Sequence, residues 1–160
     1  MPEVLLSLGS NLEPQRHLAQ ALDALPALPQ AGAAQASALY RCPAVGFDGP
    51  DFVNAALRMP WCGSLEALQA AVHEIEDAAE RDRNAPRFAS RTLDIDIVLY
   101  GALVSEAGSG IPRAELLREA FVLRPCAEIA PEWVHPQTGQ TLAAHWADWR
   151  ARQADPLRPL

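Results

Sequence analysis

The chain has 160 residues, of which 49% are hydrophobic and 21% charged, a composition typical of one folded domain and not of a disordered segment. Its formal net charge of −7 argues against broad binding to a nucleic-acid backbone, which needs a basic surface. Cys42, Cys62 and Cys126 form no metal or redox motif, so we expect free thiols in a reducing compartment.

The first half of the sequence predicts a strand, a helix and a loop-rich segment. Residues Val4–Leu8 form a short apolar run typical of a buried strand, and Gly9-Ser10-Asn11 supplies the turn that ends it. Pro14 suits a first helical turn, and apolar residues recur after it at helical spacing: Leu18, Ala21, Leu22 and Leu25. Residues 34–40 are a weaker strand candidate, and the breakers in residues 43–50 predict an exposed loop.

The second half predicts two strands and two helices. Residues Phe52–Met59 alternate so that Phe52 and Asn54 share one face of a strand. Ser64 can cap a helix whose apolar stripe is Leu65, Leu68, Val72, Ile75 and Ala79. A further strand covers residues 91–100, and residues 141–150 predict a closing helix.

The order strand, helix, strand, strand, helix, strand predicts an α+β fold. In a split βαβ sandwich of this order, a mainly antiparallel sheet carries packed helices. We expect residues 1–160 to form a single domain. The first residues contain no basic leader and their apolar run is short, so we expect neither a signal peptide nor a membrane span.

The most informative segment is the alternating run Arg91–Tyr100. Its apolar side chains are expected on one face: Leu93, Ile95, Ile97 and Leu99. Asp94 and Asp96 then lie together on the other face, with Cα atoms about 7 Å apart. Carboxylate oxygens with few histidines nearby suit Mg²⁺, and two such ions could clamp a phosphoryl transfer. The alternative is that both aspartates pair with nearby arginines.

Several side chains could complete a site around these aspartates. Four arginines lie within eleven residues: Arg81, Arg83, Arg87 and Arg91. Guanidinium groups match phosphate oxygens, so this loop is either a cationic lid or a solvated charged segment. Glu76 either borders the same site or is solvated on its helix. Phe52 with Asn54 could hold a heteroaromatic ring, although Phe52 alone could equally belong to the core.

Taken together, the residues resemble the 6-hydroxymethyl-7,8-dihydropterin pyrophosphokinases over most of the chain. The segments that carry the resemblance are Ser7–Leu12, Tyr40–Pro43, Phe52–Ala55, Ile75-Glu76, Arg81–Arg83, Arg91–Asp96 and Phe121–Pro131. The resemblance implies a ferredoxin-like α+β core. It also implies transfer of pyrophosphate from ATP, as co-substrate, to the hydroxymethyl oxygen of the pterin in folate synthesis, with release of AMP.

The resemblance further implies a role for each site residue. Two Mg²⁺ ions would bind Asp94 and Asp96, and the catalytic arginines would be Arg81 and Arg91. The pterin would lie between two phenylalanines in a site formed by Cys42, Pro43, Val45, Phe52, Asn54 and Phe121. The nucleotide would contact Glu76, Arg83, Arg87, Phe88, Ile97 and Arg113.

The nucleotide side departs from the family pattern. Arg113 stands where the family has histidine, and Glu119 stands where it has arginine, so Arg113 or Arg118 would have to compensate. One alternative is therefore a paralogue that binds a pterin or nucleotide with altered or lost turnover. Another is a nucleotidyltransferase, because such enzymes also display paired aspartates on a sheet. We expect a cytoplasmic monomer that acts on small molecules, without nucleic-acid or membrane partners.

Overall fold

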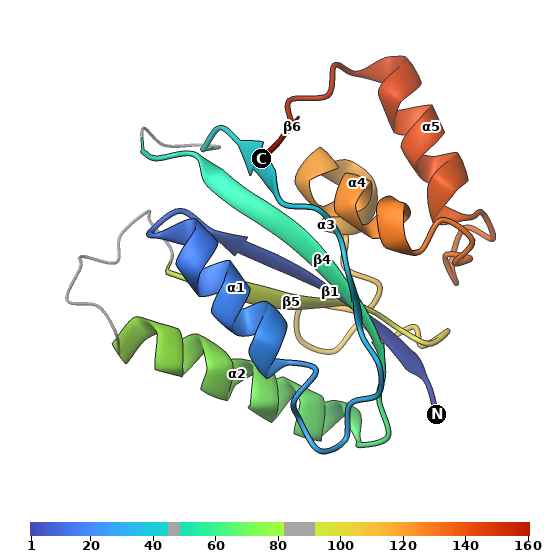
Figure 1. Cartoon of the computed structure of the whole chain (residues 1–160). Helices are drawn as coiled ribbons and strands as arrows, with labels where there is room; N and C mark the ends of the chain where they lie inside the picture. Colours follow the sequence, from blue (N-terminus) through green and yellow to red (C-terminus); the bar gives the residue numbers. More distant parts are fainter. Residues whose placement is uncertain (45–48, 82–91) are drawn as a thin grey trace.

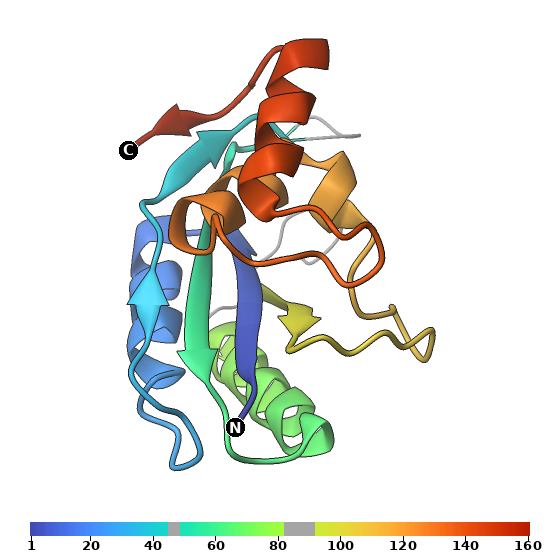
Figure 2. The same cartoon turned by 90° about the vertical axis from the view of Figure 1, so that its right-hand side faces the viewer.

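The computed structural model describes residues 1–44, 49–81 and 92–160, with only the backbone of Arg81. A six-stranded sheet lies between two groups of helices (Figures 1 and 2). Helices α1 (Pro14–Ala24) and α2 (Leu65–Arg81) cover one face of the sheet. The opposite face carries α4 (Ala120–Ile129), which is preceded by the short α3 (Glu115–Arg118) and covered by α5 (Leu142–Arg152).

The strands are arranged in the order β5-β1-β4-β3-β6, with β2 also paired to β4. Their bounds are β1 (Glu3–Ser10), β2 (Gln35–Ala36), β3 (Tyr40–Cys42), β4 (Phe52–Pro60), β5 (Asp94–Tyr100) and β6 (Arg158–Pro159). Every strand pair in the described residues is antiparallel. Because β2 and β3 lie along the same side of β4, this is the strand order of a ferredoxin-like split βαβ sheet. The predicted fold class is confirmed.

Hydroxyl caps begin two of the predicted helices, and the cap by Ser64 was itself predicted. Ser64 Oγ accepts a hydrogen bond from Ala67 N at 3.0 Å, which satisfies one of the amides in the first turn of α2 that have no partner within the helix. Thr141 Oγ1 accepts from Ala144 N at 3.1 Å at the start of α5. Both elements are therefore determined locally, by a hydroxyl cap followed by a helix-forming segment.

The alternation of β1 divides the apolar core between the two faces of the sheet. Val4, Leu6 and Leu8 belong to the cluster that includes side chains of α1 and α2, whereas Leu5 belongs to the cluster that includes α4. Each cluster is completed by residues from distant parts of the sequence. The sheet is therefore buried on both sides, except where polar residues emerge at the ends of its strands.

The side of the sheet predicted for Leu99, near the C-terminal end of β5, is wrong. Ile95 and Ile97 pair with Leu8 and Leu6, but the register then shifts, so that Leu99 pairs with Leu5. The extra residue in this irregularity turns Leu99 toward the α4 cluster, away from the face of Ile95. Strict alternation predicted one face for the whole strand, and it fails because a bulge reverses the alternation.

Other boundaries also differ from the prediction. The strand β1 continues through Ser10, so Gly9 and Ser10 belong to the strand and not to the turn that was expected there. The weak candidate at residues 34–40 is divided between β2 and β3, with Ser37 N donating to Ala56 O at 2.9 Å between them. Neither α3 nor β6 was predicted, because both are short and owe their form to tertiary contacts.

The thiols and the membrane prediction can also be compared with the structure. Cys42, Cys62 and Cys126 are all free, as predicted. Burial raises the pKa of the Cys126 thiol well above its ordinary value, so this side chain behaves as a small core residue. In the described parts of the chain, no helix combines the length and apolarity that a membrane span requires.

Candidate active site

One row of residues crosses the sheet where β1, β4 and β5 lie side by side. Gly9 of β1 pairs with Asp94 of β5 on one side and with Asn54 of β4 on the other. A Cβ atom on Gly9 would come within 2.9 Å of Asn54 Oδ1, so a larger residue would displace that amide. Since neighbouring strands lie about 5 Å apart, Asp94 and Asn54 are separated by roughly 10 Å.

Asn54 presents a buried amide that nothing in the described residues satisfies. The side chain is 5% exposed, and its Nδ2 atom has no hydrogen-bond partner there. Phe52 lies on the same face, because its Cδ1 is 4.0 Å from the same Cβ position on Gly9. The predicted common face of Phe52 and Asn54 is thus confirmed. A buried donor without a partner costs free energy, so a ligand acceptor at this position would be favourable.

Cys42 and Phe121 lie on the same side of the sheet. Cys42 pairs with Phe52 across β3 and β4, and it belongs to the core cluster against which Phe121 packs. Burial, together with nearby carboxylates, raises the pKa of the Cys42 thiol. Pro43 lines a separate open pocket of about 790 Å³, beside the C-terminal segment. Of the residues predicted to bind pterin, Val45 lies outside the described ranges.

Asp94 and Asp96 lie on one face of β5, as predicted. They pair with Gly9 and Ser7, while Ile95 between them is buried in the cluster on the opposite side. Asp96 also borders a pocket at the outer edge of this strand. The structure therefore presents two carboxylates toward the region between β5 and the α3–α4 layer.

Glu76 reaches the same strand from the neighbouring helix. Its Oε2 accepts a hydrogen bond from Ile95 N at 2.8 Å. Burial raises the pKa of the Glu76 carboxyl, the Ile95 hydrogen bond opposes this shift, and the charges of Asp94 and Asp96 add to it. Glu76 therefore lies close to both aspartates, whose charges act on its carboxyl, and its role in a nucleotide site remains a prediction.

Arg113 connects this acidic region to α3. Its Nε and Nη2 donate to Glu115 Oε2 at 3.0 and 2.6 Å, and its Nη1 lies 3.6 Å from Asp96 Oδ1. The backbone N–H of Arg113 donates to Val98 O at 3.1 Å, which holds this segment against the outer edge of β5. Arg118, with 63% of its side chain exposed, pairs instead with Glu115 and Glu119. Of the two arginines that could compensate for Glu119, Arg113 lies at the aspartates.

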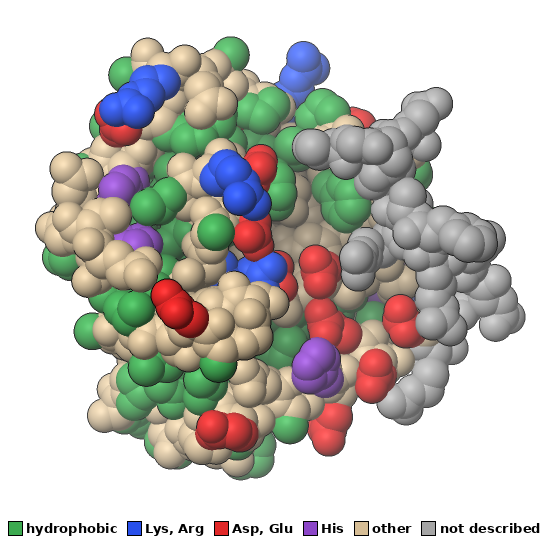
Figure 3. Space-filling model, turned by 180° about the vertical axis from the view of Figure 1, so that it is seen from behind, with side chains coloured by type: hydrophobic (Ala, Val, Ile, Leu, Met, Phe, Trp, Pro, Cys, Tyr) green, Lys and Arg blue, Asp and Glu red, His purple; other side chains and the backbone are tan. Residues whose placement is uncertain are grey.

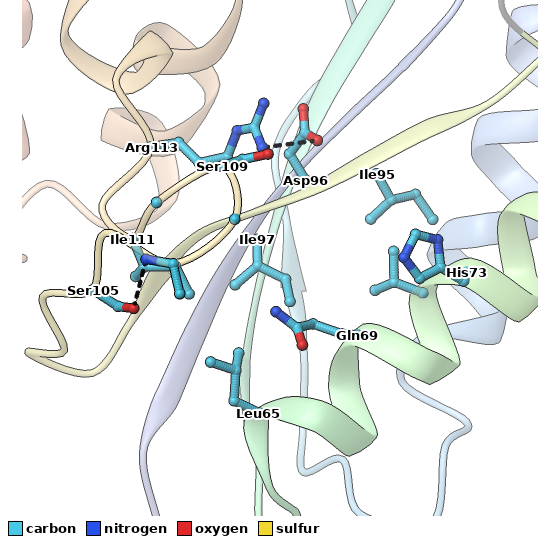
Figure 4. Close-up of a pocket in the computed structure, with 14 residues that line it drawn as sticks. Leu65, Gln69, His73, Ile95, Asp96, Ile97, Ser105, Ser109, Ile111 and Arg113 are labelled. Atoms are coloured by element: carbon cyan, nitrogen blue, oxygen red, sulfur yellow. Dashed lines mark hydrogen bonds and ion pairs between the residues drawn. The ribbon is translucent and has the colours of Figure 1, made fainter.

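A pocket of about 470 Å³ opens between β5, α2 and the loop before α3 (Figure 4). Ser105 and Ile111 close the base of this loop through two backbone hydrogen bonds of 2.8 and 2.9 Å. Ile97 and Arg113, both predicted to bind the nucleotide, line the pocket. Its other labelled lining residues are Leu65, Gln69, His73, Ile95, Asp96, Ser105, Ser109 and Ile111.

The surface seen from behind is rich in acidic side chains. Figure 3 shows carboxylates gathered along a hollow of this face, with arginine and histidine side chains beside them. Such a concentration of negative charge is unfavourable without cations. A divalent cation or a cationic side chain would relieve it.

The remaining predicted residues lie in or beside the segment that the structure does not describe. Arg81 ends α2, so its backbone lies on the helix that carries Glu76. The residues outside the described ranges are Arg83, Arg87, Phe88 and Arg91. Their predicted roles remain predictions.

Sequence reasoning missed several residues that form the site. Gly9 was assigned to a turn, although its role is to allow the close approach of Asn54. Ser10 Oγ donates to Thr92 O, which joins β1 to the start of β5. Glu115 was not considered at all, because nothing in its local pattern indicates that it binds Arg113. A glycine inside a strand is the one available signal, since it often marks a close backbone approach.

The sequence of the chain matches known proteins over most of its length. Residues 5–131 match the family described as 7,8-dihydro-6-hydroxymethylpterin-pyrophosphokinase (HPPK). The 2-amino-4-hydroxy-6-hydroxymethyldihydropteridine pyrophosphokinase of Pseudomonas aeruginosa is 40% identical over 136 residues, covering 81% of this chain and 81% of the relative. The Haemophilus influenzae protein of the same name is 33% identical, over 94% of this chain and 97% of the relative.

Solved structures support the same fold. The structure of Plasmodium falciparum HPPK-DHPS with pterin and p-hydroxybenzoate has a TM-score of 0.73 at 12% identity, covering 94% of this chain. This chain spans 43% of that longer protein, so the likeness concerns one part of it. The sequence matches and the shared fold together mean that the chain belongs to the 7,8-dihydro-6-hydroxymethylpterin-pyrophosphokinase family, the enzymes that transfer pyrophosphate to hydroxymethyldihydropterin in folate synthesis.

Proposed function

We propose that this chain carries out the family's reaction at the end of the sheet marked by Asp94, Gly9 and Asn54. The observation that supports this proposal is their common row, with an unsatisfied buried amide and a carboxylate two strands apart on one face. The separation of roughly 10 Å suits a pterin ring whose hydroxymethyl group points toward the aspartates.

The pterin would be bound by shape and by one buried polar group. Asn54 Nδ2 would donate to an acceptor on the ring, which would supply the hydrogen bond that this atom lacks in the described residues. Phe52 and Phe121 would stack on the two ring faces. The backbone around Cys42, Pro43 and Val45 would close the pocket.

The side chains of Asp94 and Asp96 fit a magnesium site. Mg²⁺ prefers one or two carboxylates, with phosphate and water oxygens as its other ligands. Within residues 1–44, 49–81 and 92–160, no group of three or more side chains forms a metal site, so the substrate's phosphates would have to supply ligands. Bound Mg²⁺ would neutralise charge on the transferring phosphates, and we propose two ions, as the family resemblance implies.

In the reaction, the pterin hydroxymethyl oxygen attacks the β-phosphorus of ATP. A new oxygen–phosphorus bond forms as the bond between the β-phosphorus and the oxygen bridging to the α-phosphorus breaks, AMP leaves with that oxygen, and the hydroxyl proton is released to water. Arg81 and Arg91 would stabilise the charge on the phosphates. The nucleotide would lie in the pocket at the β5 edge, against Glu76, Ile97 and Arg113, with further contacts from Arg83, Arg87 and Phe88.

An assay with MgATP and 6-hydroxymethyl-7,8-dihydropterin tests this proposal. Formation of AMP and a pterin diphosphate in equal amounts is the expected result. Binding of both substrates without AMP would support the alternative of a paralogue that has lost turnover, which the carboxylate of Glu119 motivates. Release of ADP would instead indicate transfer of a single phosphoryl group.

We also propose that the protein acts as a monomer in the cytoplasm on small molecules alone. No described contact in this structure requires a second chain for the row of Asp94, Gly9 and Asn54. Light scattering on the purified protein tests the oligomeric state. A stable dimer would contradict this part of the proposal.

A further inference from the structure

We infer that Arg113 is an exchangeable counter-cation, which pairs with Asp96 before metal and nucleotide bind and turns to the nucleotide phosphates when they do. Glu115 is the positioning residue that holds the guanidinium in place during this exchange. The inference rests on the proposed role of Asp96 as a metal ligand. It concerns Arg113, which stands where the family resemblance leads us to expect histidine.

The two contacts of Arg113 differ in strength. Two nitrogens of the guanidinium donate to the same oxygen of Glu115, at 3.0 and 2.6 Å. The remaining nitrogen, Nη1, lies 3.6 Å from Asp96 Oδ1, an ion pair longer than a direct hydrogen bond. Arg113 can therefore give up Asp96 while it keeps Glu115.

The position of Nη1 determines what replaces Asp96 as its partner. Arg113 lines the pocket at the β5 edge, as Asp96 does, and only 21% of its side chain is exposed. Figure 4 shows the guanidinium beside the Asp96 carboxylate at the rim of this pocket. A polyphosphate in the pocket would offer oxygens to Nη1 at the moment when a divalent cation takes over the charge of Asp96.

The backbone keeps this exchange local. Arg113 N is bonded to Val98 O at 3.1 Å, so the Cα atom of Arg113 is fixed to the outer edge of β5. Glu115 lies at the start of α3, two residues further on, and it also contacts Arg118 at 3.5 Å. Only the outer end of one side chain has to turn, and no helix has to move.

The exchange predicts opposite effects of one substitution in two binding measurements. The first uses Mn²⁺ alone, counted by electron paramagnetic resonance; the second uses Mn²⁺ with α,β-methylene-ATP, followed by calorimetry. Arg113→Gln should bind Mn²⁺ alone about five- to tenfold more tightly, since it removes a cation that competes at a partly exposed carboxylate. It should bind Mn²⁺ with the nucleotide about tenfold or more weakly, because a charge-assisted hydrogen bond to phosphate is lost.

Matched variants separate this exchange from a general charge or folding effect. Arg118→Gln makes the same change in charge on an arginine that contacts Glu115 but not the pocket, and it should alter neither affinity. Arg113→Lys keeps the charge and should return the affinity for Mn²⁺ alone toward that of the parent protein. Thermal melting of each variant checks that it is folded.

Two outcomes would overturn the inference: the first overturns the exchange alone, and the second also overturns the metal role of Asp96. If Asp96→Asn lowers the affinity for Mn²⁺ but Arg113→Gln leaves it unchanged or lowers it, Arg113 does not compete for Asp96. The proposed metal role of Asp96 would survive that result. If Asp96→Asn binds Mn²⁺ as tightly as the parent protein, both the metal role and the exchange are wrong.

Discussion

Two charged clusters, one on the α4 side of the sheet and one around its β5 edge, differ in how their carboxylates are paired. In the first, Arg58 binds Glu3 and Glu132, each with a shortest distance of 2.9 Å, and its guanidinium lies 5.1 Å from the ring centroid of Trp133. In the second, Asp94, Asp96 and Glu76 gather around β5. In the first cluster both carboxylates are paired with Arg58, whereas in the second three carboxylates lie near one another and Arg113 contacts Asp96.

One carboxyl in each cluster has a shifted pKa, and the two shifts are in opposite directions. Hydrogen bonding from Arg58 lowers the pKa of the Glu132 carboxyl. Burial, with the nearby aspartates, raises the pKa of Glu76. A carboxylate that already has its cation favours the charged form, whereas one buried among like charges does not. The contrast teaches that Arg58 holds two carboxylates in ion pairs within the chain, whereas Glu76 is buried beside two further carboxylates.

The largest effect is expected from Asp96→Ala. Turnover should fall by roughly two to three orders of magnitude, as when a group that stabilises transition-state charge is removed. Thermal stability should remain or rise, because one of several neighbouring carboxylates is lost. AMP release and a thermal melt measure the two quantities. Near-normal turnover would show that Asp96 has been assigned wrongly.

A smaller effect is expected from Asn54→Leu, which keeps the number and branching of the side-chain heavy atoms but removes the amide. Pterin affinity should fall roughly ten- to a hundredfold, since a hydrogen bond to a buried ligand is lost. The free energy of unfolding should change by less than about 1 kcal/mol, because the deleted Nδ2 atom has no partner in the described residues. Fluorescence titration with the pterin measures the affinity, and urea unfolding measures the free energy of unfolding. A large loss of stability with unchanged pterin affinity would mean that Asn54 is structural.

The opposite pattern is expected from Arg58→Met in the first cluster. Stability should fall by about 1–2 kcal/mol, because two partly exposed ion pairs and a cation–π contact are removed together. The KM values for ATP and pterin should not change. Arg16→Met is the matched control: it removes one exposed pair with Glu13 at 3.4 Å and should cost less than about 0.5 kcal/mol. Loss of substrate binding in Arg58→Met would break the distinction between the two clusters.

The smallest effect is expected from Glu76→Gln, measured as stability against pH in the presence of a chelator. Since the folded pKa of Glu76 is raised, its charged form is disfavoured in the fold, and the stability associated with its proton is lost as pH rises through that pKa. The variant should therefore melt at a higher temperature than the parent at about pH 7. The difference should disappear below the ordinary carboxyl pKa of 4.5, where both side chains are neutral.

Glu74→Gln provides the control for this pH dependence. Glu74 lies on the exposed side of the same helix, so its replacement should give no comparable change with pH. If both variants behave alike, the raised pKa of Glu76 does not come from its position beside β5.

The sequence by itself determined the local elements and which side chains share a strand face. The hydroxyl of Ser64 and the spacing of apolar residues after it are enough to start α2, because a cap and an amphipathic stripe are local features. Alternation alone set Asp94 and Asp96 on one face, and Phe52 and Asn54 on one face, because the side-chain period of a strand is two residues. These patterns depend only on neighbours in the chain.

The tertiary structure alone decided how these local features meet. Gly9 has to be glycine because Asn54, 45 positions later, approaches it. The bulge that turns Leu99 to the other face depends on the pairing of β5 with β1. Arg113 meets Asp96 because its backbone is bonded to the outer edge of β5. No local pattern encodes such contacts, since each depends on strand order and register, which form only when distant segments pack together.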